Sequence, residues 1–287
     1  MVTPRNIYMS DGHLRQGGFF DRLKGMCSLY ALSKVQGVPF KINFTEPFSL
    51  TDYLQPNHYD WRCDEPVEYK FPATRPLVAN PAACARLFVP PKRERHIYLG
   101  YDLLPKIAED YGESYSFGAL YRELFRPSDW LEAEVGKHLS DLGNYISVHI
   151  RAVNLLGDAT EKSPAFPRLP EAEAGRLMAR IASVLGELLR DAGGRRVLVS
   201  TDSNILSAYL CENLPDIYFV RGEIRHIGNA GSLSDAAVKK MFVDYHLLAA
   251  ADECYSLVGS GLYHSEFPLY AAQIGGIPFS RKQIIYG

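Results

Sequence analysis

The sequence predicts an α/β protein of two domains, in which the C-terminal half forms a doubly wound parallel sheet. Two observations support this class: strand-like and helix-like segments alternate after residue 144, and short turn-forming connections separate them. A third is the length of 287 residues, which indicates two domains because one domain usually has ~100–200 residues. We place the domains at 1–128 and 129–287.

The N-terminal half has a weaker pattern than the C-terminal half. We expect strands at 6–9 and 39–44, with a helix between them that begins at Asp21 and stops at Gly37. Apolar residues recur along this helix at intervals of three and four, which is typical of a helix with one buried face. Residues 50–127 are rich in Pro, Tyr and Asn and show little periodicity, so loops and short helices are expected there.

The C-terminal half alternates between strands and helices. The predicted strands are short apolar runs at 145–150, 197–200, 217–220 and 255–258. The predicted helices follow them, at 170–192, 203–214, 232–251 and 266–274. The inner face of the first helix is expected to consist of Leu177, Ile181, Val184, Leu185 and Leu188. Ligands of such sheets bind beyond the carboxyl ends of the strands, so residues that directly follow strands are the first site candidates.

Charge and cysteine content fit a globular protein with a small-molecule site. The formal net charge of -2 and the pI of about 6.5 favour neither nucleic acid nor an anionic membrane as a partner. No apolar stretch approaches the ~20 residues of a transmembrane segment, and charged residues interrupt the first twenty positions, unlike a signal peptide. The five cysteines lack zinc-site spacing. We therefore expect reduced thiols and a cytoplasmic location, provided that the chain is not a trimmed form of a longer protein.

The first candidate site is the pair His149 and Arg151 at the end of the predicted strand 145–150. The two residues are two positions apart, so they share one side of the strand. An arginine at a strand end suits a diphosphate, because its planar guanidinium is always charged and can bind two oxygens at once. The alternative interpretation is a surface arginine beside a histidine at the edge of the core.

The second candidate is the segment Thr201, Asp202 and Ser203, which closes the next strand and opens a helix. Asp202 or Ser203 can cap that helix, and from these residues alone the capping role is favoured. A carboxylate at this position can also accept hydrogen bonds from a base or a ribose. Hydroxyl groups at Thr201 and Ser203 can do the same.

Two glycine-containing turns are further candidates. The segment 259–267 combines small residues, which allow a ligand to approach the backbone, with hydroxyls and amides at a helix start that can bind phosphate. It can equally be an ordinary turn before a helix capped by Ser265. The segment 17–25 repeats the arrangement of strand, glycine turn and helix, but it is neither GxGxxG nor GxxxxGK[ST].

In this combination the chain resembles the fucosyltransferase superfamily, which includes the nodulation, core α-1,6, xyloglucan α-1,2 and protein O-fucosyltransferases. The family's His-x-Arg motif is matched by His149 and Arg151, but Ala152 follows where many members have a second arginine. The turn at Gly17 and Gly18, followed by Arg22, resembles the family's donor-facing loop. The remaining matches are Thr201-Asp202, Asp244, Ser265-Glu266-Phe267 with Ala271, and Gly275-Gly276.

The resemblance covers 17–45 and most of 145–276, and it implies a GT-B-like fold of two Rossmann-like domains that face a cleft. Residues 1–128 would be the acceptor-side domain and 129–287 the donor-binding domain. It also implies an inverting transfer of fucose from GDP-fucose to a glycan acceptor, with no cofactor and no metal. The sequence contains no Asp-x-Asp pair, the usual cradle for a divalent ion, so fixed cations must stabilise the leaving diphosphate.

The resemblance also assigns roles to individual residues. Arg151 would hold the β-phosphate. The expected donor-binding residues are Gly17, Gly18, Arg22, His149, Arg151, Thr201, Asp202, Ser203, Ser265, Glu266 and Phe267. The general base for the acceptor hydroxyl is expected to be Asp158 or Glu161, with Asp21 and His13 as alternatives.

Other functions remain open on the residues alone. The donor can be another nucleotide sugar, such as GDP-mannose or a UDP-sugar. Because Ala152 replaces a frequent arginine, a degenerate protein that binds a nucleotide or carbohydrate without turnover is a second possibility. A dehydrogenase is disfavoured by the absence of GxGxxG after any strand, and a serine hydrolase by the absence of GxSxG.

Overall fold

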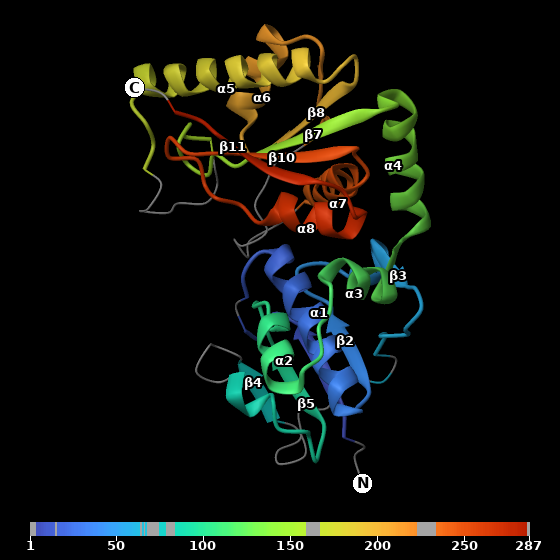
Figure 1. Ribbon diagram of the computed structural model, residues 1–287. Helices are drawn as coiled ribbons and strands as arrows, with labels where there is room; N and C mark the ends of the chain where they lie inside the picture. The colour runs from blue at the N-terminus through green and yellow to red at the C-terminus, as the bar shows by residue number, and fades with distance from the viewer. Residues whose placement is uncertain are drawn as a thin grey trace. The chain divides into compact units, whose positions relative to one another are not determined.

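The structure is a computed structural model, in which the chain divides into two compact units, Met1–Ser128 and Asp129–Gly287 (Figure 1). The residues that it describes are 4–14, 16–63, 65, 67, 75–78, 84–158, 167–222 and 234–285. Within these ranges, no helix combines the length and the apolar character needed to cross a membrane.

The first unit is built on a four-stranded parallel sheet in the order β2-β1-β5-β4, and an antiparallel pair joins β3 to β6. Its elements are β1 (Asn6–Ser10), α1 (Phe19–Gln36), β2 (Phe40–Phe44), β3 (Leu54–Pro56), β4 (Arg75–Val78), β5 (Arg95–Tyr98), α2 (Leu104–Tyr111), α3 (Phe117–Leu124) and β6 (Phe125–Pro127). The strand that follows β1 in the chain lies on one side of it, and β5 lies on the other. The direction of winding therefore reverses between β1 and β5.

Helix α1 agrees closely with its prediction. It begins at Phe19 rather than at Asp21, and it stops at Gly37, whose φ of 66° is a left-handed conformation that favours glycine. Gly25 brings the helix close to the backbone after β5. A Cβ atom there would lie 2.0 Å from the Leu99 carbonyl oxygen, so a larger residue would force the two segments apart.

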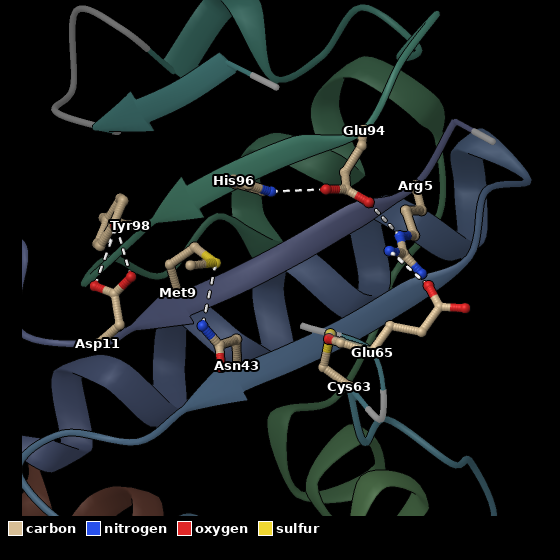
Figure 2. A network of polar contacts seen from close by, with 9 residues as sticks. All are labelled: Arg5, Met9, Asp11, Asn43, Cys63, Glu65, Glu94, His96 and Tyr98. Atoms are coloured by element: carbon tan, nitrogen blue, oxygen red, sulfur yellow. Dashed lines mark hydrogen bonds and ion pairs between the residues drawn. The ribbon is translucent and has the colours of Figure 1, made fainter. Parts of the chain in front are cut away.

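The described part of the region 50–127 contains the strands β3, β4, β5 and β6 and the helices α2 and α3, so its prediction as loops and short helices was wrong for the four strands. Strand β5 was missed because it buries polar residues in pairs. Nε2 of His96 lies 2.7 Å from Oε1 of Glu94, and Nε of Arg95 donates to Oδ1 of Asn6 at 2.9 Å (Figure 2 shows the histidine). These pairs replace the alternation of apolar and polar residues by which a strand is recognised.

The second unit contains a five-stranded parallel sheet in the order β11-β10-β7-β8-β9. Its elements are α4 (Asp129–Leu142), β7 (Tyr145–Ile150), α5 (Glu171–Asp191), β8 (Arg196–Thr201), α6 (Asn204–Asn213), β9 (Ile217–Tyr218), α7 (Asp235–Ala249), β10 (Glu253–Val258), α8 (Phe267–Gly275) and β11 (Phe279–Gln283). From β7 the chain winds outward to β8 and β9, and then returns to β10 and β11 on the other side. The predicted doubly wound sheet is confirmed, and its switch point lies between β7 and β10.

Helices cover both faces of this sheet: α5 and α6 lie on one face, and α7 and α8 on the other (Figure 1). The five residues predicted for the inner face of α5 are all buried in one apolar cluster with the sheet. Helix α4 and strand β11 were not predicted. Most of β11 is exposed, as expected of an edge strand, and its sequence Phe-Ser-Arg-Lys-Gln lacks an apolar pattern.

Candidate functional site

The loops that follow β7 and β10 meet the carboxyl edge of the second sheet at its switch point, where ligands of such sheets bind. Each loop holds one non-glycine residue in a left-handed conformation, Val153 with φ of 51° and Ser260 with φ of 49°. Within the described chain these are the two non-glycine residues with positive φ. A residue held there costs of order 1–3 kcal/mol, and such strain clusters at functional sites.

Arg151 is the first residue after β7 and is held from two sides. Its NH1 lies 3.8 Å from Oδ2 of Asp202, and its guanidinium lies 5.5 Å from the centre of the Tyr263 ring. The backbone N–H of Tyr263 also donates to the carbonyl oxygen of Arg151 at 3.0 Å. The arginine side chain is 17% exposed, so it presents a positioned cation at the edge of the sheet.

Asp202, which directly follows β8, binds the turn that carries Arg151. Its two oxygens accept hydrogen bonds from the backbone N–H groups of Ala152 at 2.7 Å and Val153 at 2.9 Å. Burial raises the pKa of Asp202, although Arg151 and the two backbone amides act in the opposite direction. The carboxylate therefore holds the strained turn in place. Its predicted contact with a base or ribose stays a prediction.

Ser203 and Asp158 together cap helix α6. The Ser203 hydroxyl accepts from the N–H of Leu206 at 3.1 Å and donates to Oδ2 of Asp158 at 2.9 Å. The N–H of Ile205 also donates to this carboxylate at 2.8 Å. The capping role weighed for Ser203 is thus confirmed. Asp158 has structural partners, and Glu161 lies outside the described residues, so their predicted role as general base stays a prediction.

Thr201, at the end of β8, supports the same helix cap. Its hydroxyl oxygen accepts from the N–H of Ser203 at 3.3 Å, and both side chains are buried. Hydroxyls of the segment 201–203 are thus engaged with the helix start. A direct contact with a ligand remains an expectation for both residues.

His149 lies beneath the loops, on the face of β7 covered by α7 and α8. Its ring centroid is 5.0 Å from that of Phe267, at the start of α8. Burial, and then the charge of Arg151, lower the pKa of His149 to about 3. The imidazole is therefore neutral near pH 7. Its Nδ1 and the hydroxyl of Ser256, its neighbour on β10, have no hydrogen-bond partner among the described residues.

Asp244 of α7 lies in the same buried layer. Its Oδ2 accepts from the Ser200 hydroxyl at 3.1 Å and lies 2.6 Å from Nζ of Lys240. Asp244 was among the residues of the family resemblance, whereas Lys240 was not considered. The sequence indicated this ion pair only through its spacing, since residues four apart on one helix lie side by side.

The loop 259–267 turns sharply because glycine is required at its start. A Cβ atom on Gly259 would lie 2.6 Å from the Ile284 carbonyl oxygen, and its φ is 94°. The Ser260 hydroxyl donates to the same oxygen at 2.8 Å. Ser265 is buried and accepts from the N–H of Phe267 at 3.3 Å. These contacts fix the loop against the end of β11.

Three further residues of the family resemblance, Glu266, Gly275 and Gly276, lie at the ends of α8. Glu266 is exposed and immediately precedes the helix. Gly275 packs against the end of α7, where a Cβ atom would meet the Ala249 carbonyl oxygen at 1.9 Å. Gly276 ends the helix with φ of 68°. The glycine pair therefore serves helix packing and helix termination.

The predicted residues of the first unit form an internal network. The guanidinium of Arg22 is largely buried, and it donates to the Gly17 carbonyl at 3.1 Å, to the Ser10 hydroxyl at 2.7 Å and to the Glu46 carbonyl at 2.9 Å. It therefore ties the end of β1 to the glycine turn. Gly18 directly precedes α1. Contacts of these residues with a diphosphate stay a prediction.

Solved structures that share this fold are fucosyltransferases. The NodZ α-1,6-fucosyltransferase co-crystallised with GDP has a TM-score of 0.62 and 14% identity, over 94% of this chain and 92% of that chain. NodZ from Bradyrhizobium has a TM-score of 0.61 and 14% identity, over 94% and 92% of the two chains. POFUT1 in complex with GDP-fucose has a TM-score of 0.55 and 14% identity, over 99% and 98%.

The resemblance to the fucosyltransferase superfamily and the expected GT-B-like class are therefore confirmed at the level of the fold. No protein-family model and no curated protein sequence matches the chain. Sequence reasoning named the arginine of the switch point but missed Tyr263. A tyrosine in a glycine-containing turn after a strand was the only local signal for it.

Proposed function

We propose that the protein transfers fucose from GDP-fucose to a hydroxyl group of a glycan or glycoconjugate. The observation that carries the proposal is Arg151, which follows β7 at the switch point and is contacted by Asp202 and Tyr263. The fold shared with NodZ and POFUT1 supports the choice of donor, because solved structures of both contain GDP or GDP-fucose. In this proposal residues 129–287 bind the donor and 1–128 form the acceptor side.

Arg151 stabilises the leaving group. As the bond between the sugar and the diphosphate breaks, negative charge grows on the β-phosphate, and a preorganised guanidinium binds it with two parallel hydrogen bonds. A fixed cation performs this task without a metal ion. Neutral His149 lies below the arginine, where it orients the donor without adding a second charge.

The transfer is proposed to invert the anomeric carbon in a single displacement. The other proposed donor contacts come from the loops after β8 and β10 and from the glycine turn of the first unit. They are Gly17, Gly18, Arg22, Thr201, Asp202, Ser203, Ser265, Glu266 and Phe267.

The first experiment is a calorimetric titration with GDP, with UDP and ADP as controls and with EDTA present or absent. We expect GDP alone to bind, to bind equally well in EDTA, and to lose binding in Arg151→Ala. The matched control is Arg180→Ala on α5, a partly exposed arginine 3.8 Å from Glu187, which should bind as the wild type does. Binding of UDP instead would contradict the fucose assignment, and no nucleotide binding by a folded protein would contradict the enzyme role.

A second candidate function is a nucleotide-binding protein without turnover, and Ala152 is the observation that favours it. Its side chain is fully buried in the apolar cluster under the loop, so position 152 offers no cation where many members of the resembled family have a second arginine. Binding of GDP-fucose without release of GDP or transfer of fucose would support this candidate. Release of GDP from the bound donor would rule it out.

A further inference from the structure

A second arginine, Arg168, lies in the connection between β7 and α5, close to the start of the helix. Its side chain is exposed. Among the residues that the structure describes, its guanidinium forms no hydrogen bond and no ion pair, whereas Arg151 lies 3.8 Å from the carboxylate of Asp202. Arg168 is therefore a permanent positive charge that no carboxylate of the described chain contacts.

The side chain of Arg168 lies over the loop that directly follows β7. A Cβ atom on Gly157 would lie 2.6 Å from Nε of Arg168 and 3.0 Å from its Cζ, so the guanidinium occupies the space that a side chain at 157 would fill. Gly157 also has φ of 83°, a conformation that favours glycine. The next residue, Asp158, caps α6 directly after β8. This part of the loop, and the arginine above it, therefore lie at the carboxyl edge of the second sheet.

The backbone on both sides of Arg168 is anchored. The N–H of Leu169 donates to the Leu155 carbonyl oxygen at 2.9 Å, and the Leu169 side chain packs against the apolar cluster of the second unit. The carbonyl of Pro170 accepts from two N–H groups of the first turn of α5, both at 2.9 Å. Pro167 precedes the arginine and has a fixed φ. The chain therefore holds the backbone of Arg168 in place and leaves its charged end exposed.

The same anchor connects Arg168 to the loop that follows β10. Leu155 is buried, and a Cβ atom on Gly261 would lie 3.5 Å from its Cδ2, so the two loops pack against one another at this leucine. The loop of Gly261 also carries Tyr263, whose ring contacts the Arg151 guanidinium. Arg168 and Arg151 therefore belong to the loops of one switch point.

A bound diphosphate calls for more positive charge than Arg151 supplies. Asp202 offsets part of the charge of Arg151, and the next residue, Ala152, is buried and apolar. Both phosphates of a nucleotide sugar are negative, and the departing diphosphate gains further charge as the sugar leaves. An arginine is suited to this role because its planar fork can bind two phosphate oxygens at once.

We propose that Arg168 is a second diphosphate-binding residue of the donor site and supplies the cation that position 152 lacks. The inference rests on the proposed function. The Arg168 guanidinium donates N–H groups to phosphate oxygens of the donor and remains charged throughout. It takes no part in bond making or breaking, and it acts beside Arg151 within the second unit.

The test is a calorimetric titration of GDP into the wild type and into Arg168→Gln. Because a hydrogen bond to a charged group typically contributes a factor of about ten or more, we expect GDP affinity to fall ~10-fold. Arg168→Lys keeps the charge and should lose less. The matched control is Arg190→Gln in the last turn of α5. Arg190 is also exposed and also lies near a glycine, with its Nη1 3.7 Å from a Cβ atom on Gly186, and it forms no ion pair within the described chain. This control should bind GDP as the wild type does.

The salt dependence of binding separates a phosphate contact from a structural role. Salt screens exposed charges, so the GDP affinity of the wild type should fall as KCl is added, and that of Arg168→Gln should fall less steeply. The variant should also unfold at the same temperature as the wild type, because the arginine has no hydrogen bond or ion pair within the described chain to lose.

The outcomes distinguish this inference from the function on which it rests. A GDP affinity of Arg168→Gln within about twofold of the wild type, while Arg151→Ala loses binding, would overturn the role of Arg168 and leave the proposed function standing. Equal losses in Arg168→Gln and Arg190→Gln, or an unchanged salt dependence in Arg168→Gln, would overturn it too. If the wild type binds no GDP, the proposed function is contradicted, and the role of Arg168 falls with it.

Discussion

Each sheet places a largely buried carboxylate at its carboxyl edge, Asp202 after β8 and Asp11 after β1, and the two carboxylates hold different partners. In the second unit Asp202 holds Arg151, a side chain that is always charged, and in the first unit Asp11 holds His13, a side chain that can gain or lose a proton. An aromatic residue supports each pair, Tyr263 beneath the arginine and Tyr98 beside the aspartate.

The permanent charge of Arg151 suits the leaving group of the proposed transfer better than the charge of a histidine does. The leaving diphosphate needs a permanent positive charge, since it carries negative charge throughout and gains more in the transition state. The attacking hydroxyl needs a group that is neutral at first and accepts a proton. The comparison therefore assigns the proposed stabilisation of the leaving group to the second unit, through Arg151.

The largest effect is expected for Arg151→Lys, which keeps the charge but loses the planar fork. Loss of one preorganised donor to a developing oxyanion typically lowers turnover by ~10²–10³-fold, so we expect a decrease of this size in GDP release from GDP-fucose. Steady-state kinetics measure it, with Arg180→Lys as the matched control. A wild-type rate in Arg151→Lys would show that the arginine does not stabilise the leaving group. The comparison would then fail for the second unit.

Asp202→Asn should mainly lower stability. The amide oxygen can accept from one of the N–H groups of Ala152 and Val153, but the amide nitrogen faces the other, which loses its acceptor. An unpaired buried N–H costs about 1–3 kcal/mol, and urea unfolding of the second unit measures the loss. Asp216→Asn, at an exposed turn before β9, should change little. Equal, small effects in both variants would show that the turn does not depend on the carboxylate.

His149 and His264 should differ in how strongly each makes the free energy of unfolding depend on pH. His149 has a pKa of about 3 in the folded protein against an ordinary value of 6.5, so below pH 6.5 the unfolded chain takes up a proton that the folded one does not. Its contribution is complete above pH 6.5 and is lost as the pH falls toward 3. We expect a loss of about 1.4 kcal/mol at pH 5.5, because one pH unit corresponds to that energy.

This contribution is measured as the change in unfolding free energy between pH 7.5 and 5.5 in the wild type and in His149→Gln. The variant should lose part of the pH dependence, whereas His264→Gln, at an exposed position after β10, should keep it. An unchanged pH dependence in His149→Gln would mean that this histidine is not held neutral by burial.

The smallest effect is expected at the aromatic supports. Tyr263→Ala removes the ring beneath the Arg151 guanidinium. A cation–π contact at a partly exposed site contributes about 0.5–1 kcal/mol, so we expect GDP affinity to fall roughly two- to fivefold. Tyr263→Phe keeps the ring and should bind GDP as the wild type does. Calorimetric titration of both variants decides between ring support and a role of the hydroxyl, since loss of affinity in Tyr263→Phe would indicate the latter.

Sequence patterns predicted the second unit far better than the first. Strand β7 and the buried face of α5 were predicted residue by residue, because apolar alternation and helical periodicity are local properties of the chain. Strand β5 was missed because its polar residues find partners far away in the sequence, such as Asn6 for Arg95. Such pairing is visible only after the chain has folded.

The candidate site shows the same limit. Position after a strand singled out Arg151, yet the partners that orient it, Asp202 and Tyr263, come from two other loops of the sheet. Asp158 was expected as a general base from the family resemblance, but its carboxylate caps the start of α6. The Asp11 and His13 pair has no motif, and only the pairing of β1 with β5 brings Tyr98 to it.

The central claim is that Arg151, held at the switch point of the second sheet, stabilises the leaving group of the proposed transfer. The most direct test measures GDP release from GDP-fucose by the wild type and by Arg151→Lys, with Arg180→Lys as the matched control. We predict that the wild type and Arg180→Lys release GDP and that the rate of Arg151→Lys is ~10²–10³-fold lower. A wild-type rate of GDP release in Arg151→Lys would contradict the claim.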